Sequence, residues 1–251
     1  MPTLIASRST PVRGTPAALR YAAARLLPGA VVIYAVLAAT GLLLTRVFGT
    51  SGLIVDDRQV SAWFAGHRTG TLNTLTHVGT MLSDTPTAIA ASAVIVIVLR
   101  LTLHRWREAV TVLVAIVGEL WIFLGVTATV HRQRPTVPHL DPAPPTSSFP
   151  SGHTGAAVAL YVGLAVVLIS LVRRGDIVAP AARAGVVVGS VLLCWIPVVV
   201  GLSRLYRGMH YLTDVIAGAL AGGLWMMIVV MTLLRLGPGR ARDRTGAGRP
   251  R

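Results

Sequence analysis

Long stretches without a charged residue constrain this chain more than any other feature of its sequence. Four of them cover residues 26–45, 154–172, 184–203 and 215–234, and each approaches the ~20 residues that an α-helix needs to cross a bilayer core. A fifth, 109–130, is interrupted only by Glu119, and a sixth, 85–103, requires Arg100 to reach toward the interface. Lipid offers no partner to backbone polar groups, and these stretches are too long for barrel strands, so all six are predicted to be helices.

The composition agrees with a membrane protein, because only 13% of the residues are charged, against roughly 25% in soluble domains. We predict an all-α membrane protein, a six-transmembrane-helix bundle over residues 28–235. A basic segment, 1–27, precedes it, and its following apolar stretch has the length of an anchor rather than of a cleaved signal. The basic tail, 236–251, has no apolar periodicity and is predicted to be disordered.

The positive charges are placed in a pattern that follows the membrane topology. All 23 basic residues are arginine, and they concentrate before the first stretch, in every second connection and after the last stretch. This is the positive-inside pattern, and it predicts that both termini are cytoplasmic. The net charge of +14 therefore does not indicate a nucleic-acid partner. The absence of lysine together with abundant Ala, Val and Arg favours a bacterial protein of a high-GC genome, hence a multi-pass protein of the bacterial plasma membrane.

Three polar clusters interrupt the apolar chain: HRQRP at 131–135, PSGH at 150–153 and SRLYRGMHYLTD at 203–214. The first follows the third span and the second begins the fourth, so one loop joins them on the same side of the membrane. The third cluster connects the fifth span to the sixth and returns to that side. We therefore expect all three clusters to meet on the extracytoplasmic side.

The residue types in these clusters favour binding of a tetrahedral anion. Pro150 suits the first turn of a helix, and the N–H groups of Ser151, Gly152 and His153 would then lie at the positive end of its dipole. Guanidinium groups match phosphate oxygens in pairs, and the other two clusters supply Arg132, Arg134, Arg204 and Arg207. The sequence thus predicts a phosphate site.

Two histidines and an acid could supply the chemistry. His210 and Asp214 are four residues apart, so on a helix the carboxylate would orient the imidazole as a nucleophile or base. His153 could protonate a leaving oxygen. A metal centre is the alternative use of such ligands, but the converging arginines would repel a divalent cation, so neither a metal nor a cofactor is expected.

The motifs resemble the type 2 phosphatidic acid phosphatase (PAP2) superfamily of membrane lipid phosphatases. Its signature is Lys, six residues and Arg-Pro; then Pro-Ser-Gly-His; then Ser-Arg, five residues, His, three residues and Asp. The second and third parts are complete here, at 150–153 and at Ser203, Arg204, His210 and Asp214. In the first part Arg134 and Pro135 match, but Thr127 replaces the lysine. If the helix continued from Thr127, that residue would lie about 10 Å deeper than Arg134.

The resemblance implies that His210 attacks phosphorus to form a phosphohistidine, that Asp214 holds its ring and that His153 protonates the leaving group. Arg134, Arg204, Ser151 and Gly152 would bind the phosphoryl oxygens. Arg132, which is added to this set, or Arg207 would take the place of the missing lysine. No metal is implied. The expected substrate is a lipid phosphate or pyrophosphate: a polyprenyl pyrophosphate such as undecaprenyl pyrophosphate, phosphatidic acid or phosphatidylglycerol phosphate.

Several alternatives stay open. The same histidine chemistry serves a lipid phosphotransferase, and an inactive relative or a non-catalytic anion-binding, lipid-binding or transport protein would keep the arginines without needing His210. Glu119 is either a functional intramembrane acid or a hydrogen-bonded one between helices. Two glycine pairs, Gly185/Gly189 and Gly218/Gly222, have a spacing that permits close helix packing. The sequence does not indicate an oligomeric state.

Overall fold

Six helices of the protein are long and apolar enough to cross a membrane. The computed structural model describes residues 16–48 and 52–235. Within these ranges the six spans are Pro16–Val47, Thr85–Leu103, Arg107–Thr129, Gly152–Arg174, Pro180–Tyr206 and Leu212–Leu234. The predicted all-α, six-span membrane architecture is therefore confirmed.

The first span begins earlier than its apolar stretch suggested. Helix α1 (Pro16–Leu42) already includes Arg20 and Arg25, and a π-helical turn, η1 (Leu43–Val47), extends it. Part of the basic segment assigned to 1–27 is thus a continuation of the first helix. The remainder of that segment, and the tail predicted to be disordered at 236–251, lie outside the described residues.

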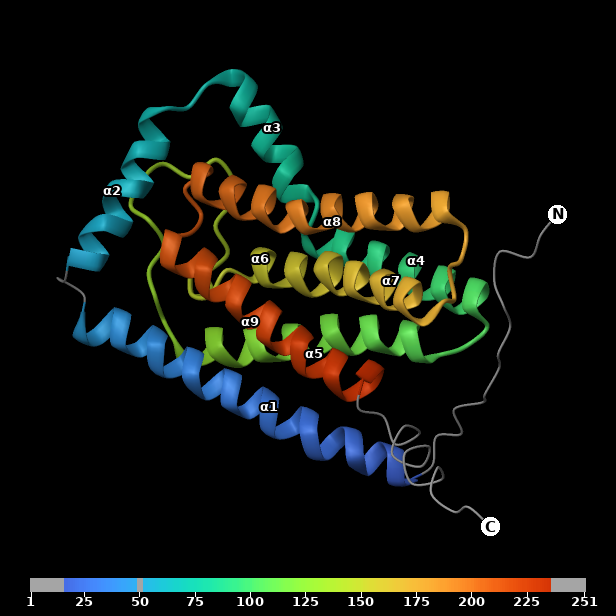
Figure 1. Ribbon diagram of the computed structural model, residues 1–251. Coiled ribbons are helices and arrows are strands. Elements are labelled where there is room, and N and C mark those ends of the chain that lie inside the picture. Colours follow the sequence, from blue (N-terminus) through green and yellow to red (C-terminus); the bar gives the residue numbers. More distant parts are fainter. Residues whose placement is uncertain (1–15, 49–51, 236–251) are drawn as a thin grey trace, which may run out of the picture.

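Helix α5 (Arg107–Thr129) lies between two groups of buried apolar side chains. One group joins it to α1 and to α9 (Leu212–Val230), and includes Trp225 and Phe149. The other joins it to α4 (Thr85–Leu103), to α7 (Gly163–Arg174) and to the end of α9. Figure 1 shows these long helices side by side.

Two helices that the sequence did not predict lie between the first and second spans. They are α2 (Gly52–Gly66) and α3 (Gly70–Met81), and both contact α8 (Pro180–Tyr206). In Figure 1 they cover the end of the bundle where α8 ends and α9 begins. That end also receives the long loop between α5 and the fourth span, so three separate connections meet there.

The fourth span starts with α6 (Gly152–Ala157) and continues through a π-helical turn, η2 (Val158–Val162), into α7. The backbone of the fourth span packs directly against glycines of α9. A Cβ on Gly218 would lie 2.3 Å from the carbonyl oxygen of Ser151, and one on Gly222 would lie 2.6 Å from that of Gly155. The close packing expected of Gly218/Gly222 is confirmed, whereas a Cβ on Gly185 or Gly189 would meet nothing within 4 Å.

Candidate active site

The three polar clusters come together at the α2–α3 end of the bundle. Arg134 of the first cluster donates from Nη1 to the carbonyl oxygen of Met209 over 2.7 Å, and the same nitrogen lies 3.5 Å from Nε2 of His210. The backbone N–H of Ser151 in the second cluster donates to the carbonyl oxygen of Asp214 over 2.9 Å. Both other clusters thus contact the third directly, as the span order predicted.

His210 occupies a turn, not a helix. Helix α8 ends at Tyr206, Gly208 adopts a left-handed φ of 73°, and α9 begins only at Leu212. The expectation that His210 and Asp214 share one helical turn is therefore wrong. Glycine reaches this backbone conformation without the strain that a side chain adds, and the turn brings the ring of His210 back among the other clusters, where it is 4% exposed.

The imidazole of His210 is oriented mainly by a backbone oxygen. Its Nδ1 lies 2.7 Å from the carbonyl oxygen of Ser148 and 3.7 Å from Oδ2 of Asp214. A carbonyl only accepts, so Nδ1 carries the hydrogen and Nε2 carries the lone pair. Burial lowers the pKa of His210; the nearby carboxylate of Asp214 opposes this shift, while the charges of Arg204 and Arg134 add to it. The ring is thus held neutral with Nε2 available for attack.

Asp214 is held in place by two other groups. Its Oδ2 accepts the N–H of Tyr211, the residue before α9, over 2.9 Å, which caps the helix. Its Oδ1 accepts from Nη1 of Arg132 over 2.5 Å. Asp214 is fully buried, so these contacts replace the water that an isolated carboxylate would need.

Arg132 does not have the free guanidinium group expected of a phosphate-binding residue, because carboxylates occupy both of its terminal nitrogens. Nη1 binds Asp214, and Nη2 donates to Oδ2 of Asp57 over 2.8 Å. Asp57, on α2, also accepts the N–H and the hydroxyl of Thr213 in the first turn of α9. Sequence reasoning missed Asp57, although an acid on the same side as several arginines is a natural partner for one of them.

Arg134 and Arg204 keep part of their hydrogen-bonding capacity unused. The Nε atom of each guanidinium is buried without a hydrogen-bond partner. The Nη1 atom of Arg204 donates to Thr80 over 2.8 Å and to Oδ2 of Asp141 over 3.2 Å. Burial of an unsatisfied N–H costs ~1–3 kcal/mol. Each of these two arginines therefore keeps one N–H that could donate to an anionic acceptor.

Asp141, which sequence reasoning also missed, links two arginines of the third cluster. Arg207 donates to it from Nε over 2.7 Å and from Nη2 over 2.5 Å, in addition to the contact from Arg204. Burial by itself would raise the pKa of Asp141, but the hydrogen bond and charge of Arg207 and the charge of Arg204 lower it below its usual value. Arg207 is thus paired within the loop.

His153 is the second residue of α6 and lies within electrostatic range of Arg204 and His210. Its carbonyl oxygen accepts from Oγ of Ser83, two residues before the second span, over 2.8 Å. This contact fixes the backbone from which its ring projects. The structure therefore brings the two histidines and two signature arginines into one site.

Ser151 and Gly152 also make contacts within the protein. Ser151 is the residue before α6, so Pro150 lies outside the helix rather than in its first turn, and the N–H of Ser151 is used by Asp214. A Cβ on Gly152 would lie 2.7 Å from the ring of Phe123. The absence of a side chain at Gly152 therefore serves packing against α5.

Thr127 lies close to the end of α5, which stops at Thr129 in favour of extended backbone at Val130. The helix does not continue to Arg134, so the condition on which the depth of Thr127 was calculated from two helical turns is not met. Its hydroxyl donates to the carbonyl oxygens of Phe123 and Leu124 in its own helix. Within residues 16–48 and 52–235, no three His, Cys, Asp or Glu side chains are grouped so that they could hold a metal ion.

The sequence profile of the PAP2 superfamily matches residues 108–237, more than half of the 251-residue chain. The chain belongs to the PAP2 superfamily. The region that carries this PAP2 match contains all three clusters, and the match confirms the resemblance recognised from the motifs.

The PAP2 fold is seen in a solved structure as well. The chain is similar to the crystal structure described as the first transmembrane PAP2 type phosphatidylglycerolphosphate phosphatase from Bacillus subtilis, with a TM-score of 0.69 and 21% identity. The similarity covers 86% of this chain and 99% of that one. In a comparison with curated protein sequences, none matches the chain. The structural likeness establishes a shared transmembrane fold.

Proposed function

We propose that this protein is a membrane lipid phosphate phosphatase that acts through a phosphohistidine. The observation that carries the proposal is the pair of unpartnered, buried Nε atoms of Arg134 and Arg204 beside the neutral ring of His210. Oxygens of a phosphoryl group would accept from both nitrogens. Guanidinium donors of this kind also stabilise the charge on a transferring phosphoryl group.

In the first step Nε2 of His210 attacks phosphorus as the bond from phosphorus to the leaving oxygen breaks. His153, entering protonated, donates its proton to that oxygen. In the second step water attacks phosphorus, the Nε2–P bond breaks, and the neutral His153 accepts the proton from water. Both histidines return to their starting states, and the products are phosphate and the dephosphorylated lipid.

The contacts around Asp214 support a positioning role for three buried groups. Asp57 holds Arg132, Arg132 holds Asp214, and Asp214 lies 3.7 Å from Nδ1 of His210. As the imidazole gains positive charge during attack, the carboxylate of Asp214 stabilises it. Asp57 and Arg132 act through Asp214 and do not need to touch the substrate.

The membrane architecture favours an amphiphilic substrate whose tail stays in the bilayer. We infer a phosphomonoester or pyrophosphate head group, with polyprenyl pyrophosphates, phosphatidic acid and phosphatidylglycerol phosphate as the substrates to compare. The arginine distribution along the sequence favours cytoplasmic termini and a site at the extracytoplasmic face of a bacterial plasma membrane. Access from the membrane side would let the head group reach the arginines without leaving the interface.

Phosphate release by the purified protein from this panel of lipids tests the proposal. We expect release from at least one lipid and its loss in His210→Ala. His131→Ala is the matched control, because His131 is an exposed histidine of the first cluster and should keep full activity. Transfer of the phosphoryl group to a second lipid without phosphate release would instead identify a phosphotransferase. Binding without turnover, unaffected by His210→Ala, would identify a non-catalytic lipid-binding protein.

The chemistry needs no metal, because both the nucleophile and the charge stabilisation come from side chains. Turnover is therefore expected to persist in excess EDTA. Complete loss of turnover in the chelator, restored by one divalent ion, would refute metal-independent catalysis while leaving the role of His210 open to its own test.

A further inference from the structure

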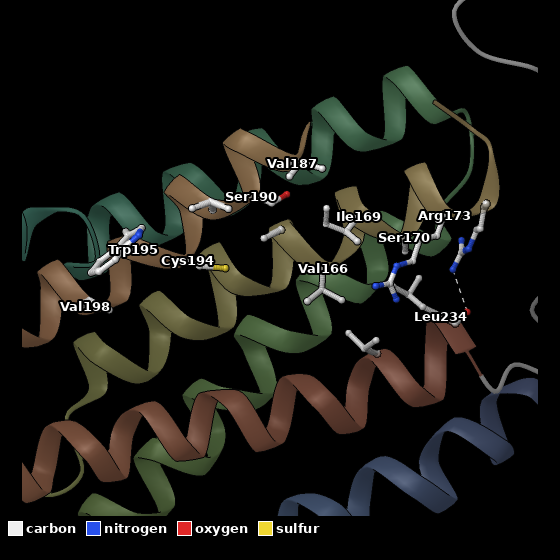
Figure 2. Close-up of a pocket in the computed structure, with 14 residues that line it drawn as sticks. Val166, Ile169, Ser170, Arg173, Val187, Ser190, Cys194, Trp195, Val198 and Leu234 are labelled. Carbon is white, nitrogen blue, oxygen red and sulfur yellow. Dashed lines mark hydrogen bonds between the residues drawn. The ribbon is translucent and has the colours of Figure 1, made fainter. Parts of the chain in front are cut away.

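A groove between α7 and α8 lies in the half of the bundle away from the active site. It has a volume of about 800 Å³, within the range of roughly 300–1,000 Å³ typical of ligand sites. Its walls come from α7, the middle of α8 and the end of the sixth span (Figure 2), including Ile169, Arg173, Ser190, Cys194, Trp195 and Leu234. No step of the proposed reaction uses these residues.

The groove is open to the bilayer and has the length of one leaflet. Val191 and Trp195 on its α8 wall are 53% and 60% exposed, and exposed apolar side chains of a membrane span face lipid. From Val187 to Val198 the wall extends roughly 16 Å at the rise of an α-helix. That is about half of the ~30 Å hydrocarbon core. The groove therefore has the length of an acyl chain within one leaflet and is too short for a chain that crosses both leaflets.

A positive charge lies at the end of the groove. Arg173, in the last turn of α7, is exposed and makes no hydrogen bond or ion pair with another described residue. The two nearby acids are already paired: Glu108 with Arg105 and Arg174, and Asp176 with Arg105. Figure 2 shows the Arg173 side chain extending toward the groove. Its charge is thus available to an anionic head group at the membrane surface.

A polar atom within the groove also lacks a partner. Ser190 is 6% exposed, lines the groove, and its hydroxyl is buried without a hydrogen bond. A buried hydroxyl without a partner is costly, and a hydrocarbon chain alone would not satisfy it. An ester carbonyl of a phospholipid would accept its hydrogen.

We propose that this groove binds one anionic phospholipid from the leaflet in which α7 ends. The phosphate of the head group pairs with Arg173, the ester group contacts Ser190, and one acyl chain lies along α8 against Trp195. Anionic lipids are attracted to arginines at the membrane surface, whereas the groove itself gives the chain a defined position. The bound lipid would be a resident of the fold and not the substrate.

Trp195 makes the proposal measurable through quenching of its fluorescence by lipids with brominated acyl chains. The difference between wild type and Trp195→Phe isolates its signal from that of the other tryptophans. In mixed micelles, we expect brominated phosphatidylglycerol to reach half-maximal quenching at a mole fraction about five-fold lower than brominated phosphatidylcholine. Arg173→Gln should abolish this preference. Arg183→Gln, which removes an exposed arginine outside the groove, should retain it.

Equal quenching by the two lipids, or an equal loss of preference in both arginine variants, would overturn the proposal. Inorganic phosphate separates a lipid site from a simple anion site. We expect millimolar phosphate to leave the quenching by phosphatidylglycerol unchanged, and full relief by phosphate alone would refute the lipid assignment. Retained phosphatase activity verifies that each variant is folded, since none of these residues lies in the active site.

Discussion

The Nδ1 atom of His210 lies 2.7 Å from the backbone oxygen of Ser148. This contact connects the loop that precedes the fourth span to the turn that precedes the sixth. Because a backbone oxygen cannot donate, it selects the tautomer of His210 whose Nε2 can attack phosphorus. The proposed nucleophile is thus oriented by the fold itself, before any substrate binds.

The loss of activity caused by removing His153 should depend on the leaving group of the substrate. With a lipid phosphate, whose alkoxide is a poor leaving group, His153→Ala is expected to lower kcat by roughly 10²–10⁴-fold. With an aryl phosphate, which leaves without a proton, the loss should be at least ten-fold smaller. Steady-state kinetics on both substrates measure the difference, and equal losses would show that His153 is not the general acid.

Asp57→Asn should lower kcat while leaving KM within about two-fold, because Asp57 acts on the nucleophile through Arg132 and Asp214. The change also removes one charge from a buried ion pair, which typically costs ~3–5 kcal/mol of stability. Asp56→Asn is the matched control, since Asp56 is an exposed neighbour on the same helix. Kinetics together with thermal unfolding measure both effects. An unchanged kcat in a folded Asp57→Asn variant would remove Asp57 from the mechanism.

The acid limb of the pH profile should lie below the ordinary histidine pKa of ~6.5. Burial lowers the pKa of His210, and protonation of Nε2 prevents attack. On the acid side, activity is therefore lost as the pH falls through this lowered pKa. The dependence of kcat/KM on pH measures the limb, with circular dichroism over the same range to detect unfolding. An acid limb above 6.5 would contradict the prediction.

Gly218→Ala should destabilise the protein by ~1–3 kcal/mol, as overpacking typically does. The added Cβ would lie 2.3 Å from the carbonyl oxygen of Ser151, which must move away from α9. Activity should fall with stability, because Ser151 begins the helix that carries His153. Gly223→Ala is the control, since a Cβ there meets nothing within 4 Å. Thermal unfolding of the two variants in one detergent distinguishes them, and equal midpoints would contradict the packing argument.

Thr127→Lys should raise kcat/KM by about ten-fold, the effect of one added charge-assisted hydrogen bond to phosphate of ~1.5 kcal/mol. The variant restores the lysine of the PAP2 signature near the end of α5. Thr127→Met, which has similar bulk without the charge, controls for size. If the lysine variant turns over lipid phosphate as the wild type does, the missing cation is irrelevant to this enzyme.

The sequence was sufficient to predict the six spans and the meeting of the three clusters, because span length and loop order depend on spacing alone. The contacts that orient the site were not predictable in this way. Ser148 acts through a carbonyl oxygen that any residue supplies, and Asp57 and Asp141 occur outside the signature motifs. As a result, Arg132 was assigned to phosphate rather than to Asp57 and Asp214.

The glycine contacts between the fourth and sixth spans limit how substrate range can evolve in this protein. Gly155, Gly218 and Gly222 bring backbone against backbone, so any side chain added between these two spans would disturb the packing that positions both histidines. Adaptation to a larger or smaller head group must therefore come from the covering helices α2 and α3 and from the loop around Asp141. Those segments can change in length and composition while the two histidines keep their spacing.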